Sequence, residues 1–171
     1  MIRNNEQRAD KPTLGIIDSK SVRNTEYPSE KGYDAGKKVS GIKVHAVTDI
    51  QGIPIGLHVT TANIQDRAGA LQLINNNKSS LVNIKTFLVD GGYSGENFAK
   101  SVANIIDGAK VKVSKRTVKH QFELEYQRWI VERSFSWLDK NRRLWKNCER
   151  LLNTYKQMVN LVFISLILRR F

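Results

Sequence analysis

Aspartates follow short apolar runs at two points in the chain, and each could supply a ligand for a cation. Leu14–Asp18 and Phe87–Asp90 both have the pattern of a buried strand that ends in a carboxylate. Gly91 and Gly92 follow the second aspartate, and without a Cβ they let a backbone, a metal or a phosphate approach closely. A strand that ends in Asp-Gly is also a common turn, so this stretch alone leaves both interpretations open.

If these two strands are parallel neighbours, Asp18 and Asp90 emerge side by side at the carboxyl edge of the sheet, where open α/β sheets place their sites. Carboxylates held that close repel each other unless a cation lies between them. Oxygen ligands favour Mg²⁺ or Mn²⁺ over zinc. We predict that Glu132, on an amphipathic helix, is the third ligand. The alternative for Glu132 is an i, i+4 pair with Arg128, worth a few tenths of a kcal/mol.

The elements that must position these side chains alternate between strands and helices in the second half of the chain. This order predicts a mixed α/β sheet with parallel members. Residues 42–48 and 53–59 predict a hairpin with Asp49 in its turn, and residues 19–41 a long basic loop. A strand of alternating valine and lysine is expected at 109–115. Helices are expected at about 66–74 (capped by Asp66 or Asn63), 95–106, 123–145 and 154–169, the last buried over most of its circumference.

The charge balance restricts the class of partner. The 28 basic residues outnumber the 16 acidic ones and give a net charge of +12, which favours a polyanionic partner, most often nucleic acid; a solvated basic surface is the alternative. Cys148 is the single cysteine, which fits a reducing compartment. The first dozen residues lack a signal-peptide pattern, and the apolar segment 158–168 is too short to span a bilayer. We therefore expect a cytoplasmic, nucleoid-associated protein without membrane contact.

Three blocks, Gly15–Ser19, Leu88–Gly95 and Arg128–Leu138, resemble the catalytic blocks of DDE transposases. The closest resemblance is to the insertion sequence five family of bacterial elements, and it extends from Leu14 to the C-terminus. It implies a ribonuclease-H-like fold, with a mixed five-stranded sheet flanked by helices and an extra C-terminal helix. We interpret residues 1–12 as a flexible leader and 13–171 as the catalytic domain. The N-terminal DNA-binding region of relatives is expected to be missing or separately encoded.

The resemblance also implies an activity. Asp18, Asp90 and Glu132 would be the catalytic residues and would hold two Mg²⁺ or Mn²⁺ ions, which hydrolyse phosphodiester bonds at the element's ends and transfer the strands to target DNA. A homodimer on double-stranded DNA is expected. Two alternatives stay open: a truncated, catalytically incomplete remnant that binds DNA and inhibits transposition, and a general ribonuclease-H-like nuclease.

Basic residues near the predicted site are candidates for contacts to DNA phosphates, and for each of them a solvated surface charge is the alternative. The candidates are Lys20, Arg23, Lys43, His45, Arg128, Arg133, Arg142 and Arg143. We interpret His45 as a polar-face residue near phosphate rather than as a metal ligand. Trp129, Trp137 and Trp145 are interpreted as core residues rather than as stacking platforms for unpaired bases.

Overall fold

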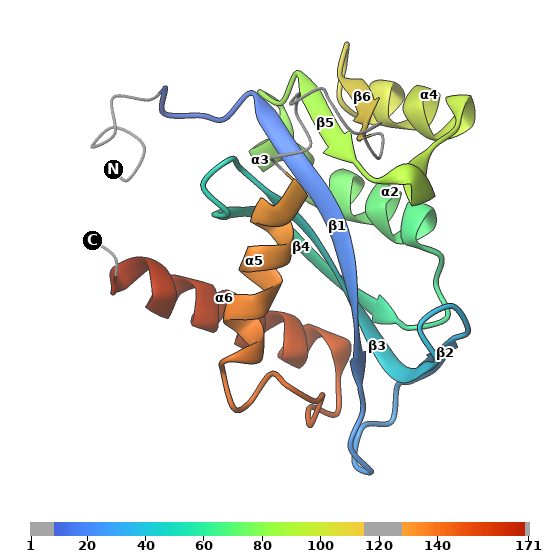
Figure 1. Cartoon of the computed structure of the whole chain (residues 1–171), viewed down its shortest axis with the longest axis vertical. Helices are drawn as coiled ribbons and strands as arrows, with labels where there is room; N and C mark the ends of the chain where they lie inside the picture. Colours follow the sequence, from blue (N-terminus) through green and yellow to red (C-terminus); the bar gives the residue numbers. More distant parts are fainter. Residues whose placement is uncertain (1–8, 115–127, 170–171) are drawn as a thin grey trace, which may run out of the picture.

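A six-stranded sheet separates two layers of helices in the computed structural model of this chain (Figure 1). The structure describes residues 9–114 and 128–169. The strands are β1 (Leu14–Arg23), β2 (Gly32–Asp34), β3 (Val39–Thr48), β4 (Pro54–Thr61), β5 (Thr86–Val89) and β6 (Lys110–Val113). The helices are α2 (Asp66–Asn76), α3 (Lys78–Leu81), α4 (Glu96–Ile105), α5 (Arg128–Asp139) and α6 (Leu152–Leu168), with a 3₁₀ turn, η1 (Gly91–Tyr93), after β5.

The sheet is mixed, as the sequence predicts. β3 pairs antiparallel with β1 and with β4, whereas β5 pairs parallel with β1 and β6 parallel with β5. The short β2 pairs with the first residues of β3, ahead of the β4 pairing, on the edge of β3 that faces away from β1. It is an addition to the five strands expected.

Two apolar cores lie on opposite faces of the sheet. Figure 1 shows α5 and α6 on one face and α2 and α4 on the other. Side chains of successive strand residues alternate between the faces. Ile16 of β1 and Leu88 of β5 therefore belong to a first core with α5 and α6. Ile17 and Val89 belong to a second core with α2 and α4. This alternation fixes the direction of every side chain that follows on these two strands.

Several predicted elements are confirmed. The hairpin of β3 and β4 turns at Asp49, whose Oδ1 accepts hydrogen bonds from the backbone N–H groups of Gln51 at 2.9 Å and Ile53 at 3.0 Å. In β6, Val111 and Val113 pack against the second core, whereas the lysines between them are exposed. This is the expected pattern for a strand at the edge of the sheet.

The predicted loop over residues 19–41 is wrong for about half of its length. β1 continues to Arg23 because its second half pairs with β3, from Asp18 opposite Ala46 to Arg23 opposite Gly41. Residues 32–34 and 39–41 are also in strands. Long-range pairing between strands, not a local pattern, orders this polar stretch.

Two helices differ from their predicted extents. α5 ends at Asp139 rather than near Trp145, and the chain then turns back to β1, where the Asn147 N–H donates to the Arg23 carbonyl at 2.7 Å. The predicted residues 123–127 lie outside the described part of the chain. α6 buries Tyr155, Val159, Val162 and Phe163 but exposes Leu161, Ile164 and Leu168, so burial over most of its circumference is wrong. Within the described residues, no helix is long and apolar enough to cross a membrane.

Candidate active site

Strand register places two aspartates at the same level of neighbouring strands. The parallel pairing of β1 with β5 ends at Ile16 and Leu88, and Asp18 and Asp90 each follow two residues later. Because side chains alternate along a strand, both carboxylates are directed to the face of the first core, which α5 and α6 cover. Asp18 is not the end of its strand, contrary to the expectation, because β1 stays paired with β3 beyond the point where β5 stops.

Asp90 both ends β5 and begins the tight turn η1. Its Oδ1 accepts a hydrogen bond of 2.9 Å from the Gly92 N–H, and its carbonyl accepts one of 3.1 Å from the Tyr93 N–H. A Cβ added to Gly91 would have no atom of the described part of the chain within 4 Å, so there this side of the turn is open to an incoming group. The turn and the ligand interpretations of Asp90 are therefore compatible.

Glu132 lies on the helix that covers the same sheet face. α5 packs through Ile130, Val131 and Phe135 into the first core, which also contains Ile16 of β1. The Glu132 side chain is exposed, about 100° around the helix from Val131. Among the described residues, no three His, Cys, Asp or Glu side chains are close enough together to hold a metal ion. Asp18 and Asp90 offer the hard oxygen ligands that Mg²⁺ and Mn²⁺ prefer, and their level positions fit such a cation.

The raised pKa of Tyr93 indicates that carboxylates lie near its hydroxyl. Burial raises the pKa of the Tyr93 hydroxyl, and the carboxylates of Asp18, Asp66 and Asp90 raise it further, against an opposing effect of Ser19. Three carboxylates therefore act on one buried phenol, and Asp66 is the one of them that is paired with Lys43. Repulsion of this kind is relieved when a cation binds.

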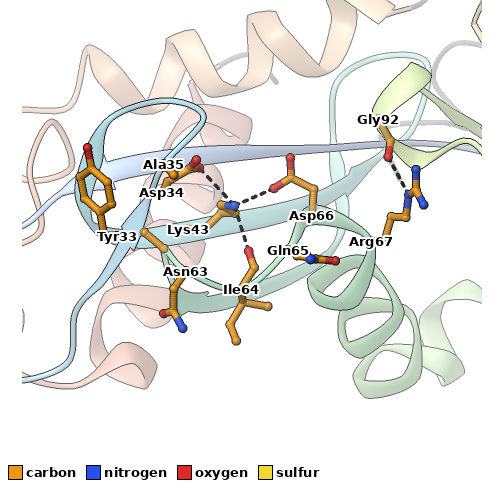
Figure 2. A pocket seen from close by; sticks show the side chains of 11 residues that line it. Tyr33, Asp34, Ala35, Lys43, Asn63, Ile64, Gln65, Asp66, Arg67 and Gly92 are labelled. Carbon is orange, nitrogen blue, oxygen red and sulfur yellow. Dashed lines mark hydrogen bonds and ion pairs between the residues drawn. The ribbon is translucent and has the colours of Figure 1, made fainter.

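Lys43 is buried and fully engaged, which argues against its predicted contact with a DNA phosphate. Its ammonium contacts Asp66 Oδ1 at 2.8 Å, Asp34 Oδ2 at 3.2 Å and the Ile64 carbonyl at 2.9 Å (Figure 2). An ammonium has three N–H donors, and three acceptors surround this one. Asp66, at the first position of α2, makes no side-chain capping bond and instead forms this ion pair, which corrects its predicted role as a cap.

Asp34 is the second acceptor of this cluster and was not singled out by the sequence pattern. Burial raises the pKa of Asp34, but hydrogen bonds from Ser21, the Lys37 N–H and Lys43 outweigh it and bring the pKa to about 2. Burial raises the pKa of Asp66, but the hydrogen bonds from Lys43 and Ser19 and the positive charges of Lys37 and Lys43 together outweigh it, so the pKa is lowered. We refer to Asp34, Lys43 and Asp66 as the buried ion cluster.

His45 is also unsuited to the predicted phosphate contact. It has no exposed surface, and its Nε2 lies 3.0 Å from Thr60 Oγ1. Burial lowers the pKa of His45 to about 3, so the ring is neutral at pH 7. Gly69 of α2 lies against this ring so closely that a Cβ there would overlap its atoms. His45 therefore lies at the packing contact between β3 and α2.

Of the other predicted phosphate contacts, three have partners within the protein, two are exposed without a side-chain partner among the described residues, and one lies outside them. Lys20 pairs with Asp139, and Arg143 pairs with Glu149 at 2.9 Å. The Arg133 guanidinium lies between the rings of Trp129 and Trp137, 4.4 and 5.0 Å from their centroids, and donates to the Gln51 carbonyl. Arg23 and Arg142 are exposed and form no side-chain hydrogen bond or ion pair within the described residues. The side chain of Arg128 lies outside the described part.

The predicted burial of the tryptophans is wrong for two of them. Trp129 is 39% exposed and Trp145 61% exposed, whereas Trp137 packs against the first core. Arg133 bridges Trp129 and Trp137 because both are four residues from it along α5.

A pocket of about 530 Å³ opens at the start of α2, next to Gly92 of the Asp90 turn, and was not predicted from the sequence. Its walls include Tyr33, Lys43, Gln65, Arg67 and Gly92 (Figure 2). Arg67 is the side chain that connects this pocket to the Asp90 turn, because its Nε donates to the Gly92 carbonyl at 2.8 Å. The sequence signal for it was weak, since a single arginine after a helix start is common.

Solved structures with the same architecture define the fold class. A chain of the cryo-EM structure of the simian T-cell lymphotropic virus intasome, in complex with a PP2A regulatory subunit, matches with a TM-score of 0.58 and 10% identity. It covers 92% of this chain and 49% of its own length. The catalytic core domain of BIV integrase matches with a TM-score of 0.54 and 9% identity, over 90% of this chain and 82% of its own length. At these identities the likeness shows the fold alone, which is the expected ribonuclease-H-like α/β fold.

The family follows from the sequence itself. The model of the transposase DDE domain matches residues 9–168, and the chain therefore belongs to this family. A similar protein is the "Putative transposase for insertion sequence element IS402" of Burkholderia cepacia, 32% identical over 117 residues, 64% of this chain. The alignment covers 54% of that relative, so the chain spans about half of its length. The expected resemblance to DDE transposases is confirmed, and the assignment to the insertion sequence five family stays a prediction.

Proposed function

We propose that this chain is the catalytic part of an insertion-sequence transposase, which cuts phosphodiester bonds at the ends of the element and transfers the strands to target DNA. The observation that carries the proposal is the common level of Asp18 and Asp90 on the sheet face that α5 covers. Membership of the transposase DDE domain family supports the same activity. The net charge of +12 supports a nucleic acid partner.

Asp18, Asp90 and Glu132 are the proposed ligands of two divalent ions. When bound, such ions activate a water or a 3′-hydroxyl for attack and stabilise the leaving oxygen. Asp18 and Asp90 supply a preformed half of the site, because strand register fixes them. Glu132 is exposed and follows the buried Val131 on α5. We propose that its carboxylate moves to the metal ions held by Asp18 and Asp90 when DNA and metal are bound.

The open surface beside Gly91 is where the scissile phosphate would lie, since no atom of the described residues fills that space. Arg23 and Arg142, which are exposed, and Arg128, whose side chain lies outside the described part, are the remaining candidates for positioning contacts to the DNA backbone. We retain as proposals a dimer on DNA, the division into a leader (1–12) and a catalytic domain (13–171), and a separately encoded DNA-binding region.

A second candidate function is DNA binding without cleavage, by a remnant that inhibits transposition. The observation in its favour is that the described residues contain no assembled group of three metal ligands. A general nuclease without preference for the element's ends is a third outcome that the same experiment separates.

The test is Mg²⁺- or Mn²⁺-dependent nicking and joining of a DNA duplex that carries the element's own ends. The wild type is compared with Asp90→Asn and with Asp107→Asn, which removes the same charge from an exposed turn after α4. We expect wild-type and Asp107→Asn activity to be equal and Asp90→Asn to lose at least a hundredfold. Equal activity of all three would contradict the metal-site assignment. Binding without any cleavage by the wild type would favour the remnant, and equal cleavage of unrelated duplex the general nuclease.

A further inference from the structure

We propose that Arg67 is a positioning residue that fixes the turn carrying Asp90 and thereby sets the affinity of the site for a divalent cation. This inference rests on the proposed function, because it assumes that Asp90 is a metal ligand. It concerns a residue outside the three ligands, on α2, an element on the opposite face of the sheet from α5.

Two hydrogen bonds connect Arg67 to the Asp90 carboxylate by way of Gly92. Arg67 Nε donates to the Gly92 carbonyl at 2.8 Å, and the Gly92 N–H donates to Asp90 Oδ1 at 2.9 Å. Figure 2 shows the Arg67 side chain reaching from the start of α2 to Gly92. The N–H and the carbonyl of Gly92 lie in two successive peptide planes. The internal hydrogen bonds of the turn hold these planes relative to each other, so a bond that fixes the carbonyl also restrains the N–H and the carboxylate that accepts from it.

The turn needs such support because its own sequence is permissive. Gly91 and Gly92 occupy adjacent positions, and glycine adopts more backbone conformations than any other residue. Two other hydrogen bonds of the turn are internal to it, from Tyr93 N to Asp90 O and from Ser94 N to Gly91 O. Internal bonds keep the shape of a turn, whereas a bond to another element also fixes its orientation relative to Asp18.

α2 is a firm support for this bond. Ala70, Leu73 and Ile74 are fully buried in the second core, which also contains Val89, the residue before Asp90. The first turn of α2 is further held by the buried ion cluster, in which Asp66, the neighbour of Arg67, is paired with Lys43. The segment that carries Arg67 is therefore anchored on both sides.

Positioning and simple electrostatics predict opposite results when Arg67 is changed. A guanidinium beside a cation site repels the cation, so removing its charge alone strengthens cation binding. Removing a hydrogen bond that orients a ligand weakens binding, and outer-shell partners of metal ligands typically contribute 10- to 100-fold in affinity. The sign of the change therefore separates the two effects.

The experiment compares Arg67→Gln with Arg67→Met in the full chain without DNA. Glutamine Nε2 is reached through the same number of bonds as arginine Nε, so Arg67→Gln keeps a donor and loses the charge. Methionine has a similar length and no donor, so comparing the two neutral variants tests the donor without a change of charge. Mn²⁺ dissociation constants are measured from the electron paramagnetic resonance signal of the free ion, with wild type and Asp90→Asn as references. Arg67→Ala serves as a second variant without a donor, and circular dichroism verifies folding.

We expect Arg67→Met and Arg67→Ala to bind Mn²⁺ about three- to tenfold more weakly than the wild type, and Arg67→Gln to bind within about twofold of it or more tightly. If the Gln, Met and Ala variants bind equally, or all bind more tightly than the wild type, the positioning role is overturned while the proposed function stands. If the wild type and Asp90→Asn bind Mn²⁺ equally, Asp90 is not a ligand, and the proposed function and this inference are both overturned.

Discussion

Asp18 and Asp90 stand two residues beyond Ile16 and Leu88, the last paired residues of two parallel strands. Their proximity is therefore set by backbone register and not by contacts between their own side chains. The residues that precede them, Ile17 and Val89, are buried in the opposite core, which prevents either strand from rotating about its axis. The fold thus holds two negative charges together that gain nothing from each other in the absence of a cation.

We expect the protein to lose stability when the Lys43 ammonium is removed from the buried ion cluster. Lys43→Met would leave the carboxylates of Asp34 and Asp66 without their shared partner. A loss of about 1–2 kcal/mol is expected, less than for a fully buried pair, because both carboxylates are partly exposed to solvent. Urea unfolding measures the change. Lys112→Met, at an exposed position of β6, should change stability by less than about 0.5 kcal/mol. Similar values for both variants would show that the cluster contributes nothing.

We expect the stability of the protein to fall at acidic pH because the pKa of His45 is lower in the fold than in the unfolded chain. The pKa is 6.5 in a solvated histidine and about 3 in the fold, chiefly because burial disfavours the charged ring. The unfolded chain therefore binds a proton below pH 6.5 that the folded chain does not, so this contribution is complete above pH 6.5 and is lost as the pH falls toward 3. Between pH 6.5 and 5 we expect a loss of about 1.5 kcal/mol from this group.

The measurement is urea unfolding at several pH values between 6.5 and 5, where most carboxylates remain ionised. His45→Gln should remove most of the slope. The pKa of His58 is also lowered by burial, so His58→Gln removes a smaller part and keeps the contribution of His45. An undiminished slope in His45→Gln would mean that other groups cause it and that the fold does not lower the pKa of His45.

We expect Gly69→Ala to destabilise the protein, although alanine in place of glycine usually stabilises a helix. Alanine is favoured over glycine in helices by about 1 kcal/mol. At this position its Cβ would overlap the buried His45 ring, and such overpacking typically costs 1–3 kcal/mol, so we expect a net loss or at best no gain. Combining Gly69→Ala with His45→Ala should remove the clash. A clear gain from Gly69→Ala alone would contradict the tight packing of β3 on α2.

We expect a substitution of Glu132 to abolish catalysis but to change the Mn²⁺ affinity of the DNA-free protein very little. Since the described residues form no group of three ligands, Glu132→Gln should leave the Mn²⁺ affinity of the DNA-free protein within about threefold of the wild type. Asp90→Asn should lower it by tenfold or more. In the nicking assay, by contrast, Glu132→Gln and Asp90→Asn should both be inactive. Equal losses of Mn²⁺ affinity in the two variants would mean that all three ligands are assembled before DNA binds.

The strands of the site were predictable because their signals are local. The apolar runs before Asp18 and Asp90 mark buried strands, and the parallel alternation of strands and helices places them together. The valine–lysine alternation of β6 similarly predicts an edge strand. These patterns lie within a few residues, so the sequence alone suffices.

The environment of the basic residues was not predictable, because it depends on elements that are distant in sequence. The alternation around Lys43 and His45 predicts a polar face, yet β3 lies between β1 and β4 with helices on both sides, so both residues are buried. A buried lysine needs partners, and its partners Asp34 and Asp66 come from β2 and α2. The exposed side of α6 was missed for the reverse reason: its apolar residues do not reveal which of them have neighbours.

The most direct test of the central claim, that Asp18 and Asp90 form one cation site, is a double-mutant cycle of thermal stability. Asp18→Asn, Asp90→Asn and the double variant are measured with EDTA and with saturating Mn²⁺. In EDTA each single variant should be more stable than the wild type, by about 1 kcal/mol, and the second substitution should add little, because one change already relieves the repulsion. Mn²⁺ should raise the melting temperature of the wild type more than that of any variant. Additive effects in EDTA, together with equal stabilisation of all four proteins by Mn²⁺, would contradict the shared site.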